Sequence, residues 1–351
     1  MKLFLFLAAI SLLLFLPDCK DEKAGVLTTI IGIGQMPVVV KDNSGNIHVV
    51  YGNGDSILYS YSTNSGRSFS APSLISVVPK LSASHTRGPQ IAATAGGLIV
   101  TACNENGDIF SFNKKNSGQW VPGARVNDRD TVAKENLMSL SGDDQSVFAV
   151  WLDLRDKHNK IFGAKSTDGG KTWSTNFLIY ASPDATVCEC CKPSVQVKAN
   201  NVYVMFRNWL YGNRDLYLVQ SSDGGTTFGQ AQKLGNGNWA LNGCPMDGGG
   251  MALNNEGRPE TIWNRKGIIY ACKPGREEMR LGEGRSCTIE SIDNKNIYAW
   301  VQLGHVILMK PRGEIENLGK GQLPVIKAIN NDHILCVWEN DKQVQAAIID
   351  L

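Results

Sequence analysis

The chain has 351 residues, of which 42% are hydrophobic, and its formal net charge at pH 7 is +2. This apolar content excludes an intrinsically disordered chain, and the length allows either one large domain or two ordinary ones. Charged residues are spread without basic or acidic blocks, so we expect no nucleic acid partner.

Residues 1–24 have the features of an export segment followed by a short tether. Lys2 precedes an apolar run from Leu3 to Leu16, which is too short to cross a bilayer comfortably. Pro17, Asp18 and Cys19 follow the run, and this ending resembles the lipobox of bacterial lipoproteins. The resemblance implies a signal peptide over residues 1–18, lipidation of Cys19, a tether over 19–24 and attachment to a membrane at the outer membrane or cell surface. Periplasmic or fully secreted protein is the alternative.

A short turn motif recurs along the chain. In it, Ser and Asp side chains satisfy backbone groups of a turn, glycine supplies permissive backbone angles, and an aromatic residue fills the layer between sheets. The copies are Ser166, Asp168, Gly170, Thr172 and Trp173; Ser221, Asp223, Gly225, Thr227 and Phe228; and, in weaker form, Ser62, Asn64, Gly66, Ser68 and Phe69. This pattern resembles the Asp-box, or BNR, repeat of the sialidase superfamily.

Short apolar runs separated by turns surround these motifs and predict units of four strands. We therefore expect an all-β fold, a single β-propeller domain over residues 25–351, with seven blades preferred and six as the alternative. The last unit has three strands, and residues 26–31 form a spare strand that we expect to complete it and close the ring. We also expect a monomer. The units begin near Met36, Gly88, Asn136, Pro193, Gly250, Thr288 and Pro324.

The resemblance to sialidases implies a site in which three arginines bind the carboxylate of the substrate and a tyrosine paired with a glutamate acts as nucleophile. Arg87 and Arg207 match the first two arginines by their local sequence, and Arg265 matches the third by spacing. Lys192 stands where the glutamate is expected, and Cys287 lies where the tyrosine is expected. The resemblance thus implies substrate binding by arginine with an altered nucleophile pair.

Arginines in propellers also bridge blades through ion pairs, which is the alternative for each of the three. We expect such structural pairs between Arg155 and Asp156 and between Arg214 and Asp215.

Four further residues are candidates for the site. His85 could act as a general base and Asp247 as a general acid, although a lone histidine is more often structural and an Asp before three glycines more often shapes a turn. Trp209 and Tyr211 follow Arg207 and could stack on sugar rings, whereas aromatic residues at blade edges usually only pack.

Cysteines precede the inner strands of three consecutive units, so we expect them to meet at one mouth of the channel. In an oxidising compartment disulfides are the leading interpretation. A soft metal, copper or zinc, and a free catalytic thiol are the alternatives. We expect Cys244 close to at least one cysteine of residues 188–191. The candidate metal or disulfide residues are Cys188, Cys190, Cys191, Cys244, Met246 and Cys287.

The combined hypothesis is a surface protein of the sialidase superfamily that binds and processes an anionic glycan at the channel mouth, in the manner of an exo-glycosidase. The alternative is a non-catalytic propeller that binds glycan, or binds metal through thiols. The sequence leaves open whether the protein is an enzyme.

Overall fold

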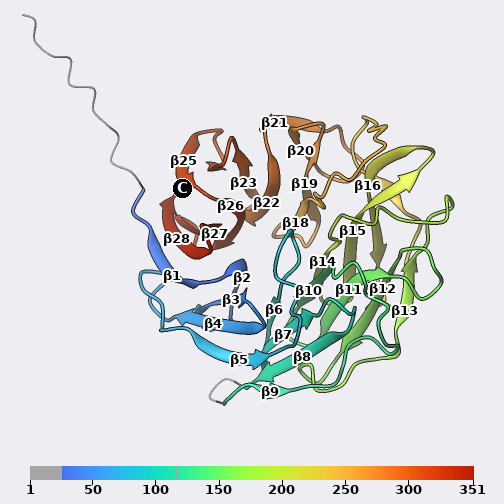
Figure 1. Cartoon of the computed structure of the whole chain (residues 1–351). Coiled ribbons are helices and arrows are strands. Elements are labelled where there is room, and N and C mark those ends of the chain that lie inside the picture. Colours follow the sequence, from blue (N-terminus) through green and yellow to red (C-terminus); the bar gives the residue numbers. More distant parts are fainter. Residues whose placement is uncertain (1–25, 116–117) are drawn as a thin grey trace, which may run out of the picture.

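The structure is a computed structural model that describes residues 26–115 and 118–351. The expected signal peptide, Cys19 and the tether lie outside the described residues. The described part is all-β, with 28 strands in seven four-stranded antiparallel sheets and no helix. The sheets form a ring (Figure 1), which confirms the seven-bladed propeller. The described residues contain no helix with the length and apolar character needed to cross a membrane.

Each blade is one sheet, and its strands follow the chain from the channel outward except in the last blade, where the first strand of the chain is outermost. Blade 1 contains β2 (Gln35–Lys41), β3 (Ile47–Asn53), β4 (Ser56–Ser62) and β5 (Ser73–Val77), and blade 2 contains β6 (Gln90–Thr94), β7 (Gly97–Cys103), β8 (Ile109–Lys114) and β9 (Val121–Pro122). Blade 3 contains β10 (Met138–Gly142), β11 (Val147–Asp153), β12 (Lys160–Ser166) and β13 (Phe177–Tyr180); blade 4 contains β14 (Ser194–Lys198), β15 (Asn201–Leu210), β16 (Asn213–Ser221) and β17 (Gln232–Lys233); and blade 5 contains β18 (Gly250–Leu253), β19 (Pro259–Arg265), β20 (Ile268–Cys272) and β21 (Met279–Glu283). Blade 6 contains β22 (Arg285–Ile292), β23 (Lys295–Gln302), β24 (His305–Met309) and β25 (Ile315–Lys320), and blade 7 contains β26 (Gln322–Ala328), β27 (His333–Asn340), β28 (Gln343–Asp350) and β1 (Thr29–Ile33).

The ring closes through the N-terminal strand, as the sequence predicted. β1 pairs antiparallel with β28, and Thr29 faces Ala346 in this pairing. The blue β1 therefore lies beside the red β28 in Figure 1. This pairing leaves blade 7 with four strands and joins the two ends of the described chain.

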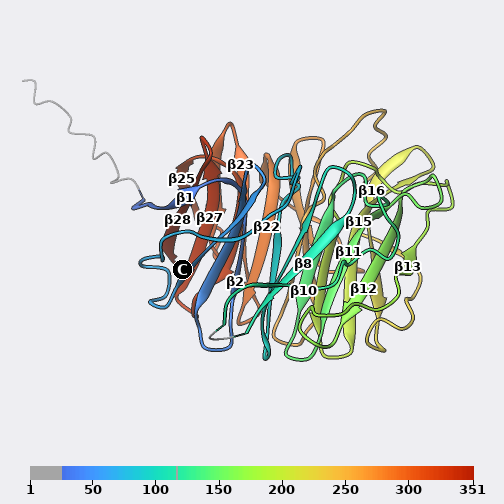
Figure 2. The ribbon, with the colours of Figure 1, turned by 60° about the horizontal axis from the view of Figure 1, so that its bottom comes forward.

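The hydrophobic core consists of seven clusters, and each fills the space between two adjacent blades. Figure 2 shows the blades standing side by side around the channel. Four tryptophans occupy second strands of their blades and are at most 2% exposed, so each removes a large apolar surface from water. They are Trp151, Trp263, Trp300 and Trp338.

The repeated turns have the hydrogen bonds that their sequence predicted. The Ser166 hydroxyl accepts a bond from the Gly170 amide (2.9 Å) and donates to Asp168 (2.9 Å), whose carboxylate accepts the Thr172 amide (3.0 Å). Trp173 packs against the cluster between blades 2 and 3. The same serine, acid and glycine bonds occur at residues 221–227. Each turn joins the third and fourth strands of a blade.

Candidate functional site

The inner strands surround a cavity of about 500 Å³ that residues of all seven blades line. Because every blade has an even number of antiparallel strands, the segments that lead into the inner strands share one end of the channel, which we call the mouth. Four of these segments are long, and we call them the long mouth loops: 78–89, 123–137, 181–193 and 234–249. The other three are single glycines, Gly34, Gly284 and Gly321.

Backbone strain is concentrated at the mouth. At six of the seven inner strands, a residue other than glycine lies at or just before the strand start with a positive φ. Such angles cost about 1 kcal/mol or more and occur often at functional sites. The residues are Met36 (φ 58°), Thr86 (φ 69°), Asn136 (φ 53°), Met246 (φ 50°), Ser286 (φ 55°) and Leu323 (φ 54°).

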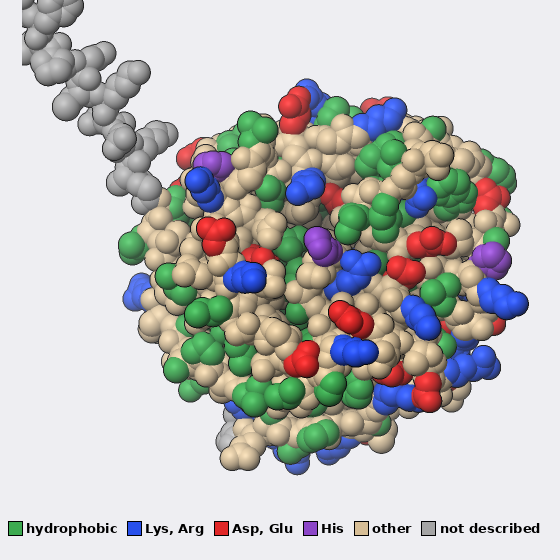
Figure 3. Space-filling model, viewed as in Figure 1, with side chains coloured by type: hydrophobic (Ala, Val, Ile, Leu, Met, Phe, Trp, Pro, Cys, Tyr) green, Lys and Arg blue, Asp and Glu red, His purple; other side chains and the backbone are tan. Residues whose placement is uncertain are grey.

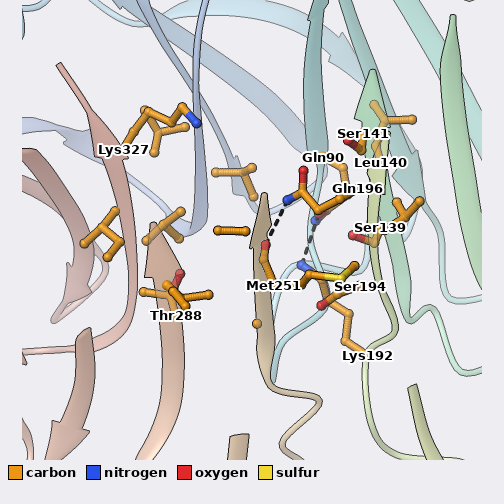
Figure 4. A pocket seen from close by; sticks show the side chains of 18 of the residues that line it. Gln90, Ser139, Leu140, Ser141, Lys192, Ser194, Gln196, Met251, Thr288 and Lys327 are labelled. Atoms are coloured by element: carbon orange, nitrogen blue, oxygen red, sulfur yellow. Dashed lines mark hydrogen bonds between the residues drawn. The ribbon is translucent and has the colours of Figure 1, made fainter. Parts of the chain in front are cut away.

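Lys192, at the end of one long mouth loop, lines the cavity. Its ammonium group donates to the Gln90 amide oxygen at 3.1 Å (Figure 4). The Gln90 nitrogen is held in turn by the carbonyls of Gly88 (3.0 Å) and Pro89 (3.1 Å). Burial lowers the pKa of Lys192 to about 8. Within residues 26–115 and 118–351, no carboxylate forms an ion pair with this lysine. The cavity therefore holds a desolvated cation whose partner is neutral.

The opposite wall of the channel also carries lysines, but their ammonium groups are bound differently. Lys327 on β26 pairs with both oxygens of Glu290 on β22 (2.9 and 3.2 Å), and it lies across the channel from Lys192 in Figure 4. Lys41 donates to the carbonyl of Ile329 (3.0 Å). On this side a carboxylate already offsets positive charge.

Arg207 is buried, with 1% of its surface exposed, and it joins blade 4 to blade 5. Its guanidinium donates to the backbone carbonyl of Asp247 through two nitrogens (3.1 and 2.9 Å). Further bonds reach the carbonyls of Asn264 (2.9 Å) and Arg214 (2.8 Å). These four bonds give Arg207 a positioning role in the structure, while its predicted contact with a sugar carboxylate stays a prediction.

Asp247 is buried below the mouth, and backbone amides bind its carboxylate. Gly249 donates to one oxygen (3.2 Å) and Ser286 to the other (2.9 Å). Next to it, Gly248 packs so closely on the Lys192 carbonyl that a Cβ there would clash. The structure thus brings Arg207, Asp247 and Lys192 together, and the general-acid role of Asp247 stays a prediction.

Arg87 and His85 lie on the long mouth loop before β6. The Arg87 guanidinium donates to the carbonyls of Glu135 (2.7 Å) and His85 (3.1 Å), and the His85 side chain is exposed. Burial raises the pKa of Glu135, and the nearby Glu189 carboxylate raises it further, while Asn159 and Arg87 oppose the rise. Glu135 and Glu189 are acids of the mouth that the sequence analysis missed, because neither belongs to a recognisable motif.

The remaining predicted sugar contacts are spread over blades 4 and 5. Arg265 forms a forked ion pair with Glu278, which raises the pKa of the arginine, and it stacks on Tyr270 at 4.2 Å. Trp209 stacks on the Arg214 guanidinium at 4.3 Å, and Tyr211 is 80% exposed. The structure does not bring these three residues together with Lys192 in the cavity lining.

The cysteines of two long mouth loops meet, as predicted. Cys190 and Cys244 form a disulfide with their α-carbons 6.1 Å apart, which confirms the expected proximity of Cys244. The sulfurs of Cys188, Cys190 and Cys191 lie within 4.8 Å of one another, a spacing that a soft metal could use once the disulfide is reduced. Cys287 is buried on β22 and lines the channel outside this group, and the exposed Met246 lines the channel as well.

Arg214 contacts the buried sulfurs, which the sequence did not predict. Its guanidinium donates to the Cys188 sulfur at 3.0 Å, whereas Asp215 pairs with Lys233 (2.9 Å), so the expected Arg214–Asp215 pair is wrong. The expected Arg155–Asp156 pair is also wrong, because Arg155 pairs with Asp153 (2.9 Å) and Asp128 (3.2 Å). In both cases a carboxylate or thiol from a neighbouring strand or loop lies nearer the guanidinium than the adjacent residue does.

Both signs of charge are interspersed on the face seen in Figure 3. No protein-family model matches the chain, and no curated protein does so either.

Solved structures do resemble it. The BP39L lectin of Burkholderia pseudomallei is 10% identical, covers 92% of this chain and 97% of its own, and has a TM-score of 0.64. The α-L-arabinofuranosidase Arb93A of Fusarium graminearum is 12% identical over 93% of this chain and 99% of its own, with a TM-score of 0.52. NanB sialidase of Streptococcus pneumoniae also matches, at 13% identity over 94% of this chain and 69% of its own, with a TM-score of 0.47. The chain therefore shares the fold of the lectin and the arabinofuranosidase.

Proposed function

We propose that this protein binds an anionic sugar at the mouth of the channel, with Lys192 as the cation that contacts the acid group. The observation that carries the proposal is a desolvated ammonium group that faces a cavity of about 500 Å³ and, among the residues that the structure describes, is bound only to the neutral amide of Gln90. A buried charge without a counter-ion is costly, and an anionic ligand would offset that cost. A cavity of this size is within the range of small-molecule sites.

A sugar is the ligand class that the fold neighbours support. Of the solved structures that share the fold, one is named a lectin and one an arabinofuranosidase. The anionic character rests on Lys192 alone. Sialic acids and uronic acids combine a carboxylate with sugar hydroxyls, which the polar side chains of the cavity can bind. These side chains include Gln90, Ser139, Ser141, Ser194, Gln196 and Thr288 (Figure 4).

Calorimetric titration with sialic, uronic and neutral sugars at pH 7 tests the proposal. We expect acidic sugars to bind and Lys192→Met to weaken their binding by about 2 to 5 kcal/mol, the range for one partner of a buried charge pair. Lys327→Met is the matched control, because Glu290 already neutralises that lysine in the same channel. Equal binding of acidic and neutral sugars, or an unchanged affinity in a folded Lys192→Met protein, would contradict the proposal.

Hydrolysis of the bound sugar is a second candidate, which the acids at the mouth favour. Glycosidases commonly use two carboxyl groups, one of which stays protonated as the general acid. The raised pKa of Glu135 suits that role, and Glu189 supplies a second carboxyl group nearby. A release assay on sialylated and uronic acid glycans should show activity that Glu135→Gln abolishes while binding persists. Binding without release by the unaltered protein would support a lectin instead.

We further propose that the protein is exported and anchored through Cys19. The apolar run before this residue and its likeness to a lipobox support the proposal. Protein made in bacteria fed with labelled fatty acid should carry the label and sediment with membranes, and Cys19→Ser should remove both properties. Unlabelled soluble protein would count against an anchor.

A further inference from the structure

Four cysteines form one continuous group at the mouth, which we call the sulfur cluster: Cys188, Cys190, Cys191 and Cys244. Cys190 and Cys244 are joined in a disulfide, while Cys188 and Cys191 are free thiols. The Cys188 sulfur lies 3.8 Å from the Cys190 sulfur and 3.6 Å from the Cys191 sulfur. The free thiol of Cys188 thus contacts both the second free thiol, Cys191, and one sulfur of the disulfide, Cys190.

The cluster extends from the interior to the surface. Cys188 and Cys191 are at most 1% exposed, Cys190 is half-buried, and Cys244 is exposed. An external reagent can therefore reach the Cys244 end, while the two free thiols are shielded. This arrangement separates the buried pair from the surface pair.

The surroundings favour Cys188 as the attacking sulfur. Its sulfur accepts a hydrogen bond from the Arg214 guanidinium at 3.0 Å and contacts the sulfurs of both Cys190 and Cys191. A cationic neighbour favours the thiolate, which is the form of cysteine that attacks disulfides. Cys188 is therefore the nucleophile of the buried pair.

We propose that the sulfur cluster undergoes intramolecular thiol–disulfide exchange, which moves the disulfide from the surface pair Cys190–Cys244 to the buried pair Cys188–Cys191. In the first step the Cys188 thiolate attacks the Cys190 sulfur, a Cys188–Cys190 bond forms, and Cys244 leaves as a thiolate. In the second step Cys191 gives its proton to the Cys244 thiolate through solvent and attacks the Cys188 sulfur, and Cys190 leaves as a thiolate. One disulfide is present throughout, so no external oxidant or reductant is required.

The exchange changes how the mouth is held together. In the surface state, the disulfide ties loop 234–249 to loop 181–193, which ends beside Lys192. In the buried state both cysteines of the bridge belong to loop 181–193, so loop 234–249 is released from this bond. A redox-neutral rearrangement can thus set the stiffness of the mouth, and this conclusion does not depend on which ligand the channel binds.

Native alkylation with iodoacetamide, followed by peptide mapping, tests each step. The protein is kept without reductant, under argon and with a chelator. In the unaltered protein we expect Cys244 and Cys190 to become alkylated and a Cys188–Cys191 disulfide to accumulate. Cys191→Ser should stop after the first step, so that only Cys244 is alkylated. Cys188→Ser should prevent both steps and slow alkylation of Cys244 by at least about tenfold, because the attacking thiolate is gone.

Cys272→Ser provides the matched control, because Cys272 is a buried free thiol on β20 outside the cluster. It should label as the unaltered protein does, and circular dichroism should show each variant folded. Equal alkylation of Cys244 in the unaltered and Cys188→Ser proteins would overturn the proposal. So would a Cys190–Cys244 disulfide that persists in the unaltered protein as long as it does in Cys188→Ser. Arg214→Gln gives a second test that keeps all thiols, since it removes the cation beside the Cys188 sulfur and should slow the exchange.

Discussion

The two halves of the ring differ in how their inner strands begin. Blades 2 to 5 are entered through the long mouth loops, which carry the sulfur cluster, Lys192, Asp247, Arg87 and Glu135. Blades 6, 7 and 1 are entered through single glycines, where the backbone packs tightly. At Gly284 and Gly321 a Cβ would clash with Trp300 and Trp338. The entries to the inner strands of this half are therefore filled by packed backbone and tryptophan side chains.

Charge follows the same division. In the glycine-connected half, Lys327 forms an ion pair with the carboxylate of Glu290. In the other half, Lys192 donates a hydrogen bond to the neutral amide of Gln90 and has no carboxylate partner among the described residues. Proteins often retain groups that reduce stability where function requires them. The difference between the two lysines therefore supports the proposal that the anion binds at Lys192.

The largest effect on stability is expected at Arg207, which joins blade 4 to blade 5. Arg207→Met leaves the carbonyls of Asp247, Asn264 and Arg214 without their donor. We expect the free energy of unfolding to fall by about 3 to 5 kcal/mol, since each unsatisfied buried group costs about 1 to 3 kcal/mol. Urea denaturation measures the change, with exposed Arg276→Met as control. A loss below that of the control would show that Arg207 does not hold the loops.

A smaller effect, of opposite sign, is expected at Lys192. Its pKa is lowered from 10.5 to about 8, so the folded protein disfavours the charged lysine. Lys192→Met should raise the free energy of unfolding at pH 7 by up to about 3 kcal/mol. The penalty is fully present below pH 8 and fades as the pH rises toward 10.5, so the gain should shrink over that range. Denaturation at pH 7 and pH 10 measures it.

Lys327→Met should act in the other direction. It leaves Glu290 unpaired and should cost about 0.5 to 1 kcal/mol, as expected for a partly exposed pair. If both lysine variants destabilised the protein equally, the two walls of the channel would not differ as described.

The smallest effect is expected at the turns, which lie in both halves. Partial desolvation raises the pKa of Asp168, but hydrogen bonds from Thr172 and Ser166 outweigh it and lower that pKa to about 2. Asp168→Asn should cost about 0.5 to 1 kcal/mol at neutral pH after allowance for solvent screening. The carboxylate's contribution to stability is present above pH 4 and lost as the pH falls toward 2. The free energies of unfolding of the unaltered and Asp168→Asn proteins should therefore converge as the pH is lowered over that range. Asp55→Asn, at an exposed site, is the control variant for the same measurement.

The fold could be predicted from the sequence because the sequence patterns that indicate it are local and repeated. Gly250 begins an inner strand as predicted, Pro193 precedes another by one residue, and the spare N-terminal strand lies where the count of strands required it. Turn residues, strand alternation and the repeated motif all act within a few residues of each other, and each blade repeats them.

The arrangement of the candidate site could be predicted from the sequence only in part. The proximity of Cys244 to Cys190 followed from the position of mouth loops in the ring. The direction of the Arg207 side chain could not be predicted, because its partners are backbone carbonyls from three segments. Every residue has a backbone carbonyl, so the sequence does not indicate which of them will accept these hydrogen bonds. The sequence shows Lys192 as a departure from the sialidase pattern. That this lysine has no carboxylate partner among the described residues depends on the three-dimensional positions of the carboxylates, which the sequence does not give.

The pairing of β1 with β28 also has a consequence for the time course of folding. The residues that meet there, such as Thr29 and Ala346, are far apart in the sequence, so the ring cannot close before β28 has been synthesised. Until then β1 has no strand partner, and an open strand edge is the usual starting point for aggregation. Bringing such distant segments together also costs chain entropy. Ring closure therefore has to wait for β28, and a chain cut short before this strand would leave blade 7 incomplete.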